Sequence, residues 1–182
     1  MWTDLAYALA AAAASVFHAG ALTFGNSPLG LVNLWLIIAV GLVADFRLRR
    51  ALIVAVVGGL TADSLSSLSP GITAIAGVSA VLLAGILIVR VFTQQSVAAI
   101  VGLQAVAFVV FWLVLLASHA GRLVLMGWTA ESAVWPGFTS FLTAVAVQCV
   151  VAVLFHSVGR WFVRRFSAIV LVVARRPRPL RP

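Results

Sequence analysis

The chain has 182 residues, of which 64% are hydrophobic and only 9% carry a charge. Its mean hydropathy is +1.20, whereas an average soluble domain is only about half apolar and about a quarter charged. This composition excludes a water-soluble domain and predicts an all-α integral membrane protein. The net charge of +8 comes from arginines in short clusters between apolar stretches, which argues against a nucleic-acid-binding protein.

Six apolar segments are long enough to cross a bilayer as helices. A spanning helix needs about 20 residues to cross roughly 30 Å of hydrocarbon. The segments that qualify are 4–24, 29–45, 50–67, 71–92, 96–118 and 135–157. The first lacks the basic region of a signal peptide and carries Asp4 instead, so we expect it to be retained as a helix. Pro28 is well placed to start the second helix.

The arginines predict the orientation of this compact six-helix bundle. Six spans place both termini on one side of the membrane, and eleven of the twelve arginines then share that side. Because cytoplasmic loops attract arginine, we expect both termini in the cytoplasm. We expect Asp45 to pair with Arg49, four residues later, at this face. The inner-face charge cluster comprises Arg47, Arg49, Arg50, Arg160, Arg164 and Arg165.

The sequence divides into a transmembrane domain, residues 1–159, and an arginine-rich cytoplasmic segment, residues 160–182. After the sixth span only nine consecutive residues are uncharged, which is too few to cross the bilayer. On a helix, the arginines of this segment share one broad arc opposite apolar side chains. That pattern is typical of a helix that lies in the inner leaflet surface and binds anionic headgroups. An ordinary positively charged tail that frays after the sixth span fits the sequence equally well.

One carboxylate lies inside an apolar span. Asp63 is about 20 Å along the third helix from its cytoplasmic start, in the outer half of the bilayer. A buried charge at that depth is costly unless it is hydrated, paired or protonated. Serines follow it, then Pro70 ends the helix and Gly71 permits a sharp reversal. The pattern predicts either a polar site that opens outward or an aspartate that caps its own turn.

The remaining residues contain no pattern for catalysis, a metal or a cofactor. His18, His119 and Glu131 are predicted on the same side as Asp63, but their spacing matches no metal-binding motif. The single cysteine, Cys149, excludes an intramolecular disulfide and any multi-cysteine metal site. There is no GxSxG, no glycine-rich phosphate loop and no pair of acids on one helix face. We therefore expect a protein that is not an enzyme and carries no cofactor.

The stretch "GLTADSLSSLSPG", which ends at residue 71, resembles a segment of the rod shape-determining protein MreD family. In that family a Gly-Leu pair, an Asp, a Ser and a closing Gly recur in this order. Here these residues are Gly59, Leu60, Asp63, Ser66 and Gly71. In this chain Pro70 directly precedes the closing glycine, and Ser67 stands where the family often has glycine. The specific resemblance covers roughly residues 27–92, and the chain length and six-span layout are similar too.

The resemblance implies a non-enzymatic scaffold of the bacterial wall-elongation machinery. Such a protein would lie in the cytoplasmic membrane, bind the membrane-anchored partner MreC and sit near the peptidoglycan synthases. The family is also similar in fold to the substrate-binding subunits of energy-coupling-factor vitamin transporters. That similarity supplies the alternative, a six-helix subunit whose outward cavity near Asp63 holds a small molecule.

Overall fold

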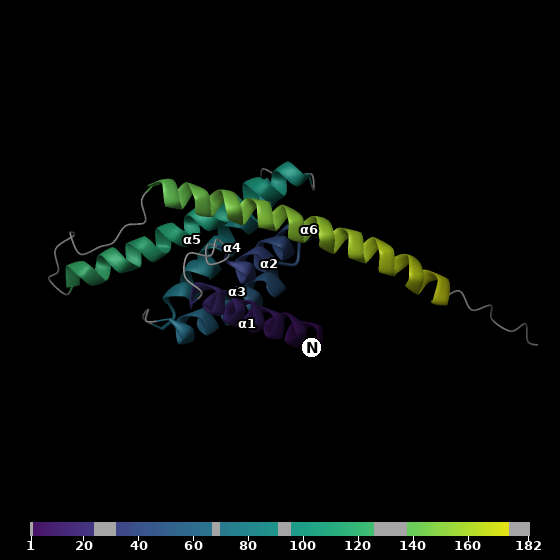
Figure 1. The fold of residues 1–182 in the computed structure, drawn as a ribbon, viewed down its shortest axis with the longest axis horizontal. Helices are drawn as coiled ribbons and strands as arrows, with labels where there is room; N and C mark the ends of the chain where they lie inside the picture. The colour runs from purple at the N-terminus through teal and green to yellow at the C-terminus, as the bar shows by residue number, and fades with distance from the viewer. Residues whose placement is uncertain (1, 24–31, 67–69, 91–95, 126–137, 175–182) are drawn as a thin grey trace, which may run out of the picture.

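The computed structural model describes residues 2–23, 32–66, 70–90, 96–125 and 138–174. The described chain is helical, which confirms the predicted all-α class (Figure 1). The helices are α1 (Trp2–Thr23), α2 (Leu34–Ala44), α3 (Leu48–Leu65), α4 (Ile72–Arg90), α5 (Val97–Leu125) and α6 (Phe138–Ala174). Three segments are long and apolar enough to cross a membrane: Ile72–Arg90, Ala98–Ser118 and Phe141–Gly159. The chain is therefore a multi-pass membrane protein.

The shortest helix, α2, lies at the centre of the bundle. Its 11 residues, LWLIIAVGLVA, include no charged or amide side chain, and it contacts each of the other five helices. A helix that is apolar all round is stable when it is surrounded, and most of α2 is buried. At about 17 Å it is too short to cross the bilayer alone. The helix begins later than the predicted 29–45 because residues 32 and 33 are not helical, and Pro28 lies outside the described residues.

Trp35 of α2 fills the space between α3 and α4. Its indole is fully buried and meets the ring of Phe111 on α5 edge-on, with ring centroids 5.6 Å apart. A Cβ built on Gly58 of α3 would lie 2.8 Å from this indole, and one built on Gly77 of α4 would lie 2.6 Å from it. Glycines on two different helices therefore allow both backbones to approach the ring closely.

Helices α3 and α4 also touch each other through their backbones. A Cβ built on Gly59 would lie 2.4 Å from the Cα of Ala74, so only glycine permits this approach. On the other side of α3, the buried hydroxyl of Ser15 lies 2.8 Å from the carbonyl oxygen of Gly58. Small residues at helix contacts are typical of membrane proteins, and here they join α1, α3 and α4.

The last helix, α6, is continuous over 37 residues, or about 55 Å. Figure 1 shows its C-terminal part projecting beyond the other helices. The predicted boundary between residues 159 and 160 therefore lies inside a helix. Arg160, Arg164 and Arg165 belong to this same helix, so the chain neither frays after the predicted sixth span nor starts a separate helix there. The side chains of these three arginines lie outside the described part of the structure.

The contact between α3 and α4 predicts a large effect of one methyl group. Gly59→Ala should lower the free energy of unfolding by about 1–3 kcal/mol, because backbone atoms of Ala74 cannot move aside as a flexible side chain could. The measurement is the thermal unfolding midpoint of the purified protein in detergent. Gly41→Ala is the matched control, since nothing lies within 4 Å of a Cβ added there. Equal midpoints for the two variants would contradict the close approach of α3 and α4.

Candidate functional site

The polar stretch at residues 63–71 joins the end of α3 to the start of α4. Ser66 is the C-cap of α3, and its backbone N–H donates to the carbonyl oxygen of Asp63 at 3.3 Å. Gly71 has a φ of 92°, in the left-handed region that favours glycine. The Gly71 carbonyl accepts the first helical hydrogen bond, from Ile75 at 2.9 Å. Gly71 is therefore the N-cap residue of α4, yet it has no side chain with which to cap the open amides.

Asp63 supplies the missing cap from the preceding helix. Its Oδ2 accepts hydrogen bonds from the N–H of Gly71 at 2.9 Å and from the N–H of Ala74 at 3.4 Å. Its Oδ1 accepts from the N–H of Thr73 at 3.0 Å. Thr73 and Ala74 are the second and third residues of α4, the positions to which an N-cap side chain normally bonds. The carboxylate also places a negative charge at the positive end of the α4 dipole.

Of the two alternatives that the sequence suggests, the contacts of Asp63 fit the aspartate that caps its own turn, because the N–H of Gly71 within the 63–71 stretch donates to its Oδ2. The residue is only 4% exposed, so its carboxylate does not line an open polar site. It also caps the following helix, through the N–H groups of Thr73 and Ala74. The hydroxyls of Ser64 and Ser66 donate to the backbone of α3, Ser64 to the carbonyl oxygen of Thr61 at 2.7 Å and Ser66 to that of Asp63 at 3.3 Å.

Three of the residues that carry the family resemblance, Gly59, Asp63 and Gly71, belong to one joint between two helices. Ala74 links them, because its Cα lies against Gly59 while its N–H bonds to the Asp63 carboxylate. Gly71 provides the reversal, and Pro70 precedes it at an exposed position of the turn. We name this set, Gly59, Asp63, Gly71 and Ala74, the α3–α4 joint.

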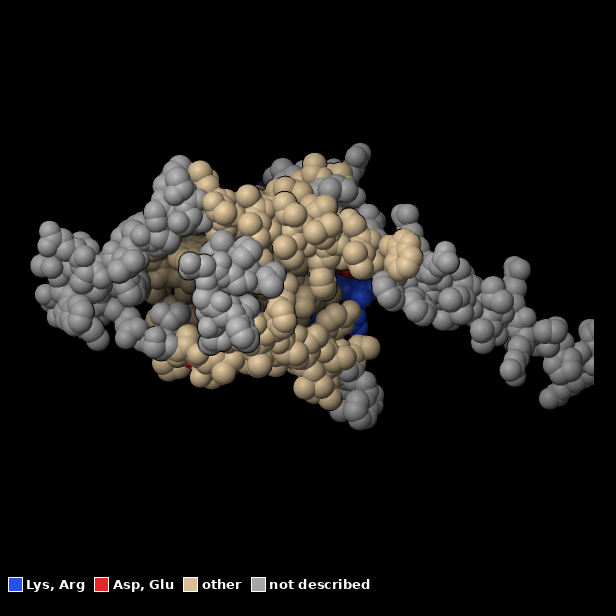
Figure 2. Space-filling model, in the orientation of Figure 1, with Lys and Arg blue, Asp and Glu red and all other residues tan. Residues whose placement is uncertain are grey.

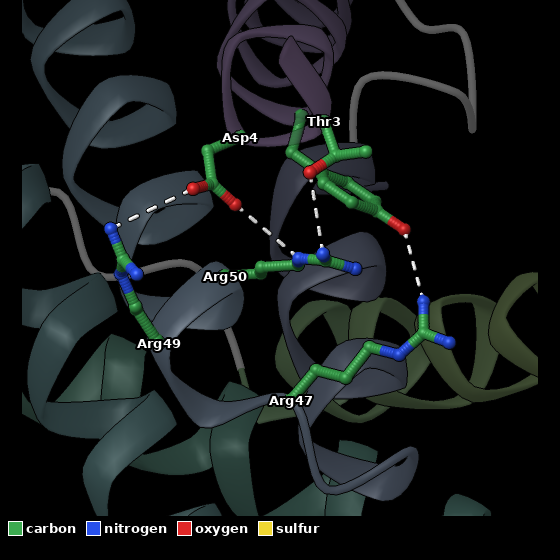
Figure 3. A network of polar contacts seen from close by, with 6 residues as sticks. Thr3, Asp4, Arg47, Arg49 and Arg50 are labelled. Atoms are coloured by element: carbon green, nitrogen blue, oxygen red, sulfur yellow. Dashed lines mark hydrogen bonds and ion pairs between the residues drawn. The ribbon is translucent and has the colours of Figure 1, made fainter. Parts of the chain in front are cut away.

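Three members of the predicted arginine cluster, Arg47, Arg49 and Arg50, lie at the opposite end of α3, where they contact the start of α1 (Figure 3). Asp4 lies between two guanidinium groups, with its Oδ1 3.3 Å from Nε of Arg50 and its Oδ2 3.7 Å from Nη2 of Arg49. Arg50 also donates to the hydroxyl of Thr3 at 3.3 Å. The first turns of α1 and α3 therefore face the same side of the molecule, as the six-span topology requires.

The predicted pair between Asp45 and Arg49 is wrong. Asp45 is the C-cap of α2, whereas Arg49 lies in the first turn of α3. The spacing of four residues aligns two side chains only on a continuous helix, and here a turn intervenes. The ion pair of Arg49 is formed with Asp4 instead.

A buried amide on α6 is a site residue that the sequence analysis missed. Gln148 is fully buried, and its Oε1 accepts from the backbone N–H of Asn33 at 2.8 Å. Its Nε2 donates to the backbone carbonyl of Asn33 at 3.1 Å. Asn33 is the N-cap of α2, and its own side chain accepts from the N–H of Leu36. A glutamine inside an apolar span was the signal available, because amides there form hydrogen bonds between helices.

The described residues include no group of three or more His, Cys, Asp or Glu side chains that could hold a metal ion. His18 lies on α1, while Glu131 and the side chain of His119 are outside the described part of the chain.

Comparison of the chain with protein-family models, with curated proteins and with solved structures finds no match.

The α3–α4 joint predicts graded effects of substitution at Asp63. If the side-chain oxygen of asparagine replaces Oδ2, it still accepts the hydrogen bonds from the N–H groups of Gly71 and Ala74. The NH2 group then faces the N–H of Thr73, and two donors meet. Asp63→Asn should therefore lower the free energy of unfolding by about 1 kcal/mol, and Asp63→Leu, which leaves every one of these amides unpaired, by about 3 kcal/mol or more. Thermal unfolding of the purified variants measures both changes.

A matched control for these variants is Ser64→Ala, which should change the free energy of unfolding by less than about 0.5 kcal/mol because Ser64 is exposed. Wild-type stability of Asp63→Leu would show that the cap contributes nothing. Loss of function in Asp63→Asn at normal stability would instead show that the site works through its charge.

Proposed function

We propose that this chain is a non-enzymatic component of the bacterial cell-wall elongation machinery. It would act in the cytoplasmic membrane as a scaffold for MreC and the peptidoglycan synthases. The observation that carries the proposal is that the Asp63 carboxylate is buried and accepts hydrogen bonds from three backbone N–H groups. Gly59, Asp63 and Gly71, three of the residues that resemble the MreD family, thus belong to a joint that fixes two helices against each other, as a scaffold needs. A binding or catalytic aspartate would keep its oxygens free for a ligand.

The alternative is a small-molecule-binding subunit of an energy-coupling-factor transporter. One observation favours it: two buried donors, Nε1 of Trp35 and Nε2 of Gln104, have no hydrogen-bond acceptor among the described residues. An unpaired buried donor is unfavourable, and a ligand with acceptor oxygens would relieve it. This ligand would bind between α2 and α5, which carry these two donors.

The proposed orientation places both termini in the cytoplasm and the α3–α4 joint outside. The arginines at the start of α3 support it, because arginine accumulates on the cytoplasmic side. In a Cys149→Ser background, Ser66→Cys should react with a membrane-impermeant thiol reagent in intact cells. Arg49→Cys, at the opposite end of α3 and 85% exposed, should react only after permeabilisation. Reaction of both from one side, or in the reverse order, would contradict this topology.

Affinity capture of the tagged chain from bacterial membranes distinguishes the two functions. A scaffold should bring down MreC and the elongation glycosyltransferase and transpeptidase, and its depletion should turn rods into spheres. A binding subunit should bring down an ATPase module and carry a small molecule that mass spectrometry identifies. Capture should fall with Asp63→Leu but not with Asp45→Asn, a control aspartate that is exposed at the other end of α3. Recovery of an ATPase module without elongation proteins would refute the scaffold.

A further inference from the structure

The turn between α2 and α3 holds a phenylalanine in an unfavourable backbone conformation. The N–H of Phe46 donates to the carbonyl of Val43 at 2.9 Å, and the N–H of Arg47 donates to that of Leu42 at 2.8 Å. These two bonds form a Schellman motif, in which the residue after the C-cap is usually glycine. Phe46 occupies that position with a φ of 57°, which is strained for any residue with a Cβ. Its side chain is 61% exposed, so burial within the chain does not offset the strain.

This turn lies at the level where a membrane-crossing helix ends. Leu48, at the start of α3, packs beside Gly85 of α4, since a Cβ built on Gly85 would lie 3.1 Å from the Leu48 side chain. Helix α4 is long enough to span the bilayer and ends at Arg90, about 8 Å beyond Gly85. The exposed ring of Phe46 and the half-exposed side chain of Leu48 therefore lie near the boundary between hydrocarbon and headgroups, where aromatic side chains accumulate.

Two arginines of this turn have weak partners within the described residues. Arg47 is exposed and donates to the neutral hydroxyl of Tyr7 at 3.4 Å. Arg49 is 85% exposed, and its 3.7 Å ion pair with Asp4 is of the solvent-screened kind that contributes little. Arg50, in contrast, is the closer partner of Asp4 and also stacks on Tyr7, with its guanidinium carbon 5.3 Å from the ring centroid.

The arginines around the turn, Arg47, Arg49 and Arg50, outnumber the neighbouring carboxylates of Asp4 and Asp45. The main blue surface in Figure 2 lies at the end of the helix bundle from which α6 projects. A guanidinium group matches the oxygens of a phosphate in charge and in geometry. An exposed aromatic ring beside two such groups matches a ligand that has both a phosphate and an apolar tail.

We propose that the turn bearing Phe46, Arg47 and Arg49 binds an anionic phospholipid. The guanidinium groups of Arg47 and Arg49, which lie on either side of Arg50 (Figure 3), attract the anionic headgroup, and the Phe46 ring lies among the first carbons of the acyl chains. The lipid then supplies the burial that the strained residue lacks in the protein alone. This site does not depend on the proposed scaffold function.

Lipid titration of the purified full-length protein in detergent tests the site. Phosphatidylglycerol should raise the thermal unfolding midpoint and remain bound in native mass spectrometry, whereas phosphatidylcholine should do so far less. The double variant Arg47→Gln and Arg49→Gln should bind phosphatidylglycerol roughly 30-fold more weakly, from the attraction of two arginines to an anionic surface. Unchanged affinity in this variant would overturn the proposal.

A second variant separates lipid binding from the stability of the fold. Phe46→Gly should raise the midpoint without lipid by about 2–4 °C, because glycine relieves the strain, and yet weaken the retention of phosphatidylglycerol. Leu65→Gly, an exposed apolar residue at the other end of α3, is the matched control and should leave retention unchanged. Full retention by Phe46→Gly, or equal protection of the wild type by soluble glycerol phosphate, which has no acyl chains, would overturn the proposal.

Discussion

The arrangement of the first four helices depends on one carboxylate that caps a helix other than its own. The first amides of a helix have no partner within that helix, and inside a membrane protein they find little water to bond to. Helix α4 begins after a glycine, which permits the reversal of the chain but offers no capping group. Asp63 resolves this conflict from α3. The same bonds that satisfy α4 stabilise the aspartate charge, so each buried group is acceptable only because of the other.

The fixed angle between α3 and α4 determines how the core residue Trp35 packs. The two helices present Gly58 and Gly77 to different parts of the Trp35 ring, and these glycines fit the ring only when the helices keep their relative position. Trp35 in turn anchors α2 at the centre, where contact with every other helix compensates for its short length. The outer helices α1, α4 and α6 expose large apolar side chains, Leu9, Ile86 and Leu154 among them, to the surrounding lipid.

Apolar run length was sufficient to predict the helices and their order, but it did not locate their ends. The start of α2 depends on Asn33, whose backbone is satisfied by a glutamine far along the chain, and local hydropathy contains no trace of that contact. The end of α6 was misplaced because a helix can continue into charged residues once it leaves the hydrocarbon. Asp63 was recognisable as unusual, yet its partners lie eight to eleven residues later, across a reversal of the chain. The error at Asp45 had the same origin, since sequence spacing was read as if no turn intervened.

The two hydrogen bonds between the Gln148 side chain and the Asn33 backbone limit how far α6 can slide along its own axis. Helix α6 also packs through apolar side chains, such as Phe141 against Trp112 of α5, and apolar side chains in lipid have little preference for one vertical position over another. A shift by one turn, about 5.4 Å, would separate both hydrogen bonds and leave the Gln148 amide and the Asn33 backbone unpaired in the interior. Gln148 therefore fixes the position of α6 along the membrane normal. It sets how much of the helix stands clear of the bilayer, and so the height at which a protein outside the membrane would meet it.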